Sequence, residues 1–174
     1  MRSRLLIALP LIGVCLVLAP SPAAAQDWQD YPYPEHGFAV HFPAPPTVTK
    51  GVYKTTTGIA VPSTVYAVKK DNILYSVTVG DFSQTAIDDQ AVIDDAVKAA
   101  GLAGEIKLDV DARISRRYGP ELSVKGKDGS YSMMAIFFFD HRFYNLVGKV
   151  MPPDAEAGAS KTIRFQQSLQ FPGI

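Results

Sequence analysis

The stretch YSMMAIFFFDHRFYNLVGKV, residues 131–150, decides the fold. It predicts a hairpin of two strands, residues 131–139 and 143–150, joined at residues 140–142. Successive side chains of a strand point to opposite faces, and in the first of these strands both sets are apolar except for Ser132. A strand with two apolar faces lies inside a sheet and needs a covering layer on each side. We therefore expect an α+β fold: an antiparallel β-sheet meander covered by helices on both faces.

Two segments outside this hairpin have the pattern of covering helices. Residues 87–102 carry apolar side chains at helical spacing, at Ile93, Ala96, Val97 and Ala100. Pro152 and Pro153 stop the sheet, and residues 154–169 predict a second helix, with acidic side chains in its first turn. Each helix is long enough to cover part of one sheet face.

Residues 105–114 alternate between apolar and charged side chains. The apolar set is Ile106, Leu108, Val110, Ala112 and Ile114, and the charged set is Glu105, Lys107, Asp109, Asp111 and Arg113. Such alternation is typical of a strand with one face in the core and the other in water. We therefore expect the whole apolar set to lie in the core.

Residues 1–25 have the pattern of a secretory signal peptide. Arg2 and Arg4 precede an apolar run over residues 5–19, and three alanines follow at residues 23–25. This pattern predicts cleavage before residue 26, a single α+β domain over residues 26–174, and a periplasmic or secreted location.

Two other interpretations of this leader are an uncleaved membrane anchor and a lipoprotein. The apolar run is shorter than the roughly 18 residues of a spanning helix, and it contains Pro10. Val14 precedes Cys15 at the position where a lipoprotein signal has a small residue. Cleavage by the secretory route therefore fits the residues best, and no membrane insertion is expected after it.

Composition excludes some classes of function. The 174 residues carry 17 Lys and Arg against 17 Asp and Glu, and removal of residues 1–25 takes Arg2 and Arg4, which leaves a formal charge of −2. This balance lacks the basic patch that nucleic acid binding requires. Cleavage also removes Cys15, the single cysteine, so the mature domain has neither a disulfide nor a thiol nucleophile.

Sequence motifs of catalysis are missing. The chain has no H-E-x-x-H, no G-x-S-x-G, no P-loop and no G-x-G-x-x-G that opens a helix. Asp109 and Asp111 lie on the same side of their predicted strand, as paired catalytic carboxylates do, but Lys107 and Arg113 flank them and compensate their charge. This pattern indicates ordinary charge compensation, and acid/base catalysis by the pair is one of two enzymatic hypotheses.

The other enzymatic hypothesis uses imidazole. His36, His41 and His141 are the three histidines, and a fold that brought two of them together would offer ligands for Zn or Cu. Their separation in sequence predicts no such meeting. The alternative function is thus a periplasmic hydrolase or metal-dependent enzyme that uses His41 and His141 or the pair Asp109 and Asp111.

Two charged clusters have an ordinary structural interpretation. Four carboxylates at the first predicted helix, Asp88, Asp89, Asp94 and Asp95, lack the spacing of a calcium loop and indicate a solvated helix face, with Asp94 paired to Lys98. Arg113, Arg116 and Arg117 indicate a solvated strand end rather than an anion site. The sequence therefore assigns no catalytic, cofactor-binding or metal-ligating residue.

Three stretches resemble small exported bacterial proteins of PsbP-like fold. They are YPYPEHGFAVHFP at residues 31–43, YSVTV at residues 75–79, and RFYNL with RFQQSL at residues 142–146 and 164–169. The resemblance spans most of residues 26–174. It implies an antiparallel sheet between helical layers and a non-catalytic accessory role, it carries over no functional residue, and it does not point to photosynthesis.

These observations favour an exported, non-catalytic accessory or binding protein of the bacterial cell envelope. Its partner is expected to be another envelope protein or a small ligand. Aromatic side chains of the extended opening segment, such as Trp28 and Tyr33, are candidates for exposed docking residues, although large apolar side chains of this kind also serve as packing anchors.

Overall fold

The computed structural model describes residues 28–153 and 158–172 of the chain. The predicted signal peptide at residues 1–25 and the predicted start of the last helix at residues 154–157 lie outside these ranges. The described elements are, in order, β1 (Gln29–Tyr33), η1 (Pro34–His36), β2 (Phe38–Phe42), β3 (Thr47–Lys54), β4 (Ala60–Lys70), β5 (Ile73–Asp81), α1 (Asp89–Ala103), β6 (Gly104–Ile114), β7 (Arg117–Gly126), β8 (Tyr131–Phe139), β9 (Arg142–Val150) and α2 (Ala159–Gln167).

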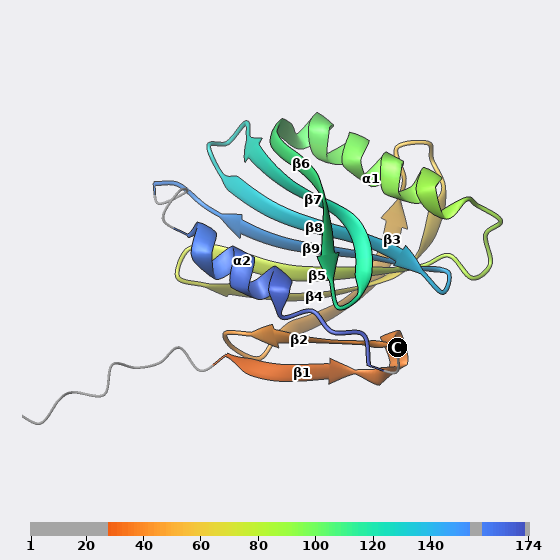
Figure 1. Ribbon diagram of the computed structural model, residues 1–174, viewed down its shortest axis with the longest axis horizontal. Coiled ribbons are helices and arrows are strands. Elements are labelled where there is room, and N and C mark those ends of the chain that lie inside the picture. The colour runs from red at the N-terminus through yellow and green to blue at the C-terminus, as the bar shows by residue number, and fades with distance from the viewer. Residues whose placement is uncertain (1–27, 154–157, 173–174) are drawn as a thin grey trace, which may run out of the picture.

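Seven strands form one antiparallel sheet in the order β3-β4-β5-β9-β8-β7-β6, and β1 and β2 form a separate ribbon (Figure 1). The predicted hairpin of β8 and β9 lies in the middle of this sheet. Its turn, Asp140 and His141, has positive φ at both residues, and so does the turn of Asp71 and Asn72 between β4 and β5. Turns of this kind match the twist of antiparallel strands.

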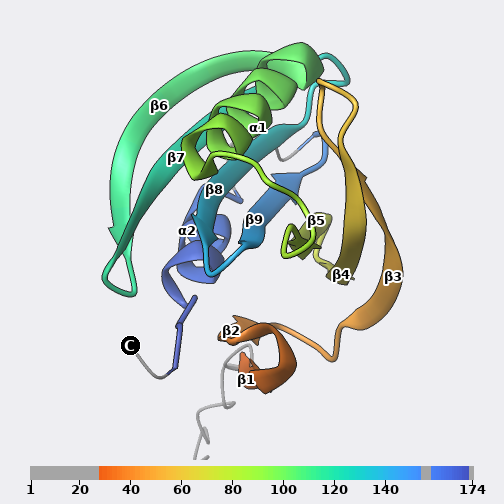
Figure 2. The same ribbon diagram turned by 90° about the vertical axis from the view of Figure 1, so that its right-hand side faces the viewer.

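The sheet is covered on both faces, as the sequence predicts. On one face α1 packs its Val92, Ala96 and Ala100 in a cluster with Leu122, Ile136 and Phe143. On the other face α2 and the β1-β2 ribbon contribute to a second cluster, which contains Phe42, Tyr75 and Phe165. Figure 2 shows α1 and the ribbon on opposite sides of the sheet. Among the described residues, no helix is both long and apolar enough to cross a membrane.

Glycine allows the second helix to approach the sheet closely. A Cβ atom added to Gly148 of β9 would lie 2.6 Å from the Cβ atom of Thr162 in α2. That distance is far below ordinary van der Waals contact, so a larger side chain would push α2 off the strand. Helix α2 therefore lies directly on the central strand of the sheet.

Helix α1 covers only half of its face. It packs on β6, β7 and β8, at one side of the sheet. On β9, β5 and β4 five residues that point to the same face are only partly buried: Val147, Ser76, Thr78, Val65 and Ala67. The open half of the sheet therefore begins at β9, along the edge of the helix.

The prediction for residues 105–114 is wrong in one respect. Lys107 is an extra residue in β6, since Ile106 pairs with Val124 of β7 and Leu108 pairs with Ser123. Directly opposed residues share a face, so Ile106 faces α1 while Leu108 and the apolar residues after it face the opposite side. Leu108 and Val110 are 42% and 43% exposed, because β6 is an edge strand that α2 does not cover.

The prediction of a solvated acidic helix face is wrong for Asp95. This carboxylate is buried and accepts hydrogen bonds from the backbone N–H of Thr56, at 3.0 and 2.9 Å, and from the Thr56 hydroxyl. Its neighbour Asp94 is exposed and accepts a bond from the Gln90 amide at 2.7 Å, rather than pairing with Lys98 as predicted. Asp95 therefore fastens α1 to the turn between β3 and β4.

Two leucines on paired strands test the exposed edge. Leu108→Ala in β6 is expected to lower the free energy of unfolding by less than about 1 kcal/mol, because the side chain is already in contact with water. Leu122→Ala in β7, at a fully buried position, is expected to cost about 2–5 kcal/mol. Urea denaturation of both variants measures the difference, and equal costs would contradict the described register of β6.

Adjacent aspartates of α1 test the tether to the β3-β4 turn. Asp95→Ala is expected to destabilise the domain by about 2 kcal/mol, because the Thr56 N–H and hydroxyl lose a charged acceptor. Asp94→Ala is the matched control and is expected to stay within about 0.5 kcal/mol of the parent. Thermal unfolding followed by circular dichroism compares them. A tolerated Asp95→Ala would show that this tether does not hold the helix.

Candidate ligand-binding pocket

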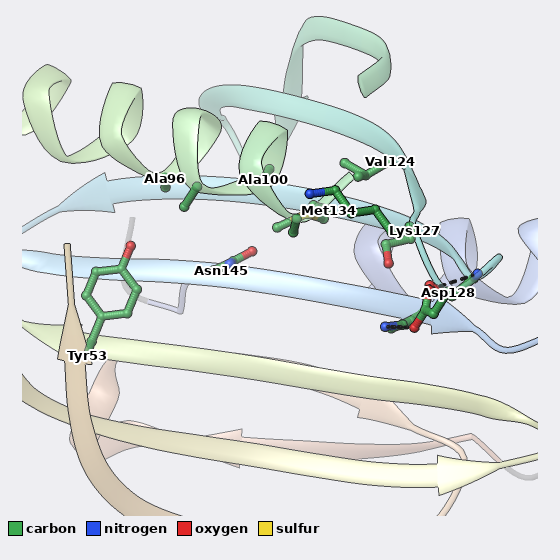
Figure 3. A pocket seen from close by; sticks show the side chains of 14 residues that line it. Tyr53, Ala96, Ala100, Val124, Lys127, Asp128, Met134 and Asn145 are labelled. Carbon is green, nitrogen blue, oxygen red and sulfur yellow. Dashed lines mark hydrogen bonds and ion pairs between the residues drawn. The ribbon is translucent and has the colours of Figure 1, made fainter. Parts of the chain in front are cut away.

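A pocket of about 470 Å³ lies between α1 and the sheet, at the edge of the area that the helix covers (Figure 3). Four alanines of α1 form its wall, and side chains of β7, β8 and β9 form its floor. A volume of this size is within the range of pockets that hold small molecules in proteins.

The wall follows from the sequence of α1. Ala96, Ala99, Ala100 and Ala103 fall at intervals of three and four residues, so they share one face of the helix. Alanine favours the helix but has a single methyl group, and it leaves space between the helix and the sheet that a leucine would fill. Val124 and Met134 continue the apolar lining on the sheet side.

Asn145 is the polar group on the floor of the pocket. It lies on β9, between Thr78 of β5 and Ile136 of β8. Its amide oxygen is buried, and no group among the described residues donates a hydrogen bond to it. A buried acceptor without a donor costs free energy, which makes this amide a candidate contact for a molecule that donates an N–H or O–H group.

One end of the pocket is built by the turn between β7 and β8. Asp128 accepts bonds from the Ser130 hydroxyl at 2.5 Å and backbone N–H at 3.1 Å, and from Lys149 Nζ at 2.9 Å. These bonds, those of Ser130 first, hold the pKa of Asp128 well below its usual range. Lys127 Nζ donates to the backbone carbonyl of Leu102, near the end of α1, at 3.3 Å. The turn is thereby fastened to both the helix and β9.

Tyr53 lies at the opposite end of the pocket (Figure 3). Its ring packs against Phe143 with 4.6 Å between ring centroids. Burial, with a smaller contribution from the charge of Asp95, raises the pKa of Tyr53 to about 12. The phenol is therefore neutral at physiological pH and presents an aromatic ring with a hydroxyl group to the pocket.

A second hollow of about 450 Å³, which we call the polar hollow after the charged side chains that line it, lies on the other side of the sheet, beside η1. Glu35, His36, Lys50 and Asp81 line it around the buried Tyr66, whose hydroxyl donates to Glu35 Oε1 at 3.3 Å. Burial lowers the pKa of His36 and raises that of Tyr66 above its ordinary value. The His36 and Tyr66 side chains are therefore neutral near pH 7. The hydrogen-bond donor of Tyr66 is already used by the Glu35 carboxylate.

The structure does not bring the three histidines to one site. His41 Nε2 lies 3.9 Å from Asp30 across the β1-β2 ribbon, His141 lies exposed in the β8-β9 turn, and His36 lines the polar hollow. Within residues 28–153 and 158–172, no three His, Cys, Asp or Glu side chains are placed to hold a metal ion. None of the histidines lines the pocket beside α1.

Asp109 and Asp111 share a groove of about 440 Å³ with Asp94 and Lys98 of α1. The extra residue Lys107 explains this meeting, because it turns both aspartates toward the helix. The groove combines three carboxylates with one ammonium group, and no histidine lines it. These aspartates thus form a charged border along α1, separate from the alanine-walled pocket.

The two candidate docking aromatics pack against the domain, and two arginines of the predicted solvated strand end contact aromatic rings. The Trp28 ring lies 5.2 Å from Tyr75, and Tyr33 lies 4.0 Å from Tyr66, measured between ring centroids. These contacts favour the packing-anchor interpretation of both aromatic residues. Arg117 and Arg113 stack their guanidinium groups on the rings of Phe139 and Tyr118.

Comparison with solved structures identifies the fold. No protein-family model and no curated protein sequence matches the chain. The solution structure of cyanobacterial PsbP from Synechocystis superposes with a TM-score of 0.58 at 12% sequence identity, covering 92% of this chain and 98% of that one. A looser superposition, with a TM-score of 0.43 at 10% identity, involves a protein of unknown function from Pseudomonas aeruginosa and covers 68% of this chain and 94% of that one. The resemblance noted in the sequence is confirmed at the level of structure: the chain has the PsbP-like fold.

Proposed function

We propose that the protein is an exported, non-catalytic binding protein of the bacterial cell envelope that holds a small, mainly apolar molecule beside α1. The observation that carries this proposal is the alanine-walled pocket with the unpartnered oxygen of Asn145 on its floor. Apolar walls with a few polar groups are typical of small-molecule sites. A fold does not by itself imply a function, so the argument depends on the pocket.

The open half of the sheet supports this function. The pocket lies at the boundary between α1 and the uncovered residues of β9, where a molecule can enter without moving a layer of the core. A small ligand is favoured over an envelope protein docked on Trp28 and Tyr33, since these rings pack against the core. The signal pattern of residues 1–25 supports export to the envelope.

A pair of alanine variants in α1 tests the pocket. Ala99→Met places a long side chain in the pocket, whereas Ala91→Met makes the same change at an exposed position of the helix outside it. Phenylnaphthylamine, an uncharged probe that fluoresces in apolar surroundings, is expected to bind the parent and the Ala91→Met protein. Binding to Ala99→Met is expected to be weaker by about tenfold or more, because the space is filled. Equal binding by all three proteins would contradict the proposed site.

Native mass spectrometry of the protein purified gently from its own source tests the function directly. The expected spectrum shows the mass of residues 26–174 together with a reproducible small added mass, and the Ala99→Met protein lacks the addition. A chain that retains residues 1–25 would contradict export by cleavage. A bare chain in repeated preparations, with no probe binding either, would contradict the binding function.

A further inference from the structure

We propose that the ligand of this pocket has an anionic, acceptor-rich head group, which lies against Lys127 and Lys149, and an apolar body that extends along α1 toward Tyr53. This inference rests on the proposed function, because it names the class of molecule that the same pocket holds. It follows from the uneven distribution of polar groups along the pocket.

The two ends of the pocket differ in chemistry. Figure 3 shows Lys127 and Asp128 together at one end, Tyr53 at the other, and Asn145 between them. Lys149 also lines the pocket and is bonded to Asp128. The four alanines, Val124 and Met134 supply the apolar surface of the pocket. A molecule that satisfies all of these groups is therefore an amphiphile that lies with its head at the β7-β8 turn.

Donors exceed acceptors at the head-group end. Each lysine ammonium has three N–H donors, and the structure uses one on Lys127, for the Leu102 carbonyl, and one on Lys149, for Asp128. Asp128, the acidic side chain of the lining, already accepts three bonds. Carboxylate, sulfonate and phosphate groups are rich in acceptors and form strong bonds to ammonium donors.

The charges at this end favour the same class of molecule. Lys149 compensates Asp128, whereas no carboxylate among the described residues forms an ion pair with Lys127. The partial negative charge at the end of α1 offsets only about half of one positive charge. A cationic head group would meet two ammonium groups here, so an anion is favoured.

Two probes with the same aromatic rings separate the head group from the body. Anilinonaphthalene sulfonate carries an anionic sulfonate, and phenylnaphthylamine lacks it. Lys127→Met keeps an unbranched apolar side chain but removes the charge, and it is expected to weaken sulfonate binding about tenfold while the uncharged probe changes by less than about twofold. Lys125→Met is the matched control, since Lys125 is exposed and lies outside the pocket. Added salt is expected to weaken only the sulfonate probe.

Three results are distinguishable. Loss confined to the sulfonate probe in Lys127→Met, with Lys125→Met unchanged, supports the anionic head group. If both probes are displaced by Ala99→Met but neither responds to Lys127→Met, the pocket stands and the proposed head group is overturned. If neither probe responds to Ala99→Met, the proposed function fails and this inference fails with it. Circular dichroism of each variant verifies that the fold is intact.

Discussion

The architecture depends on a sheet whose middle strands are apolar on both faces. Phe137 of β8 and Leu146 of β9 belong to the cluster under α2, whereas Ile136 and Phe143 of the same strands belong to the cluster under α1. Removing such surface from water on only one side would leave the other exposed, so two independent covers are required. On one face α2 and the ribbon extend across the centre, but α1 stops at β8. The pocket therefore lies at the edge of α1, where the helix ends but the apolar surface of the sheet continues.

Much of this architecture can be predicted from short stretches of sequence. The hairpin of residues 131–150 was predictable because two largely apolar runs flank a short polar turn, and the helix of residues 87–102 because its apolar residues recur at helical spacing. The face of each β6 residue was not predictable, because the extra residue Lys107 becomes visible only against the partner strand β7. Asp95 was misassigned for a related reason. In sequence Asp95 looks like Asp94. It is buried only because the β3-β4 turn, which is distant in sequence, places Thr56 within hydrogen-bond distance of it.

The candidate site was harder to predict than the fold. Sequence reasoning searches for reactive side chains, and it therefore considered His41, His141 and the pair Asp109 and Asp111. The structure places these residues outside the pocket. A cavity is created by side chains that are too small to fill a space, so its strongest signal was the spacing of four alanines in α1. Asn145 gave no signal, because an isolated amide in a strand has no pattern.

Lys107 has a consequence for how this edge of the protein can change. Side-chain direction in a strand depends on parity, so every residue after the extra one is reversed with respect to the sheet. Deleting a single residue there would turn Asp109 and Asp111 away from α1, and it would turn Leu108 and Val110 toward α1. The border of negative charge beside the helix is thus encoded in the length of the strand as much as in its composition. Insertions and deletions in β6 would therefore alter this surface more than most substitutions.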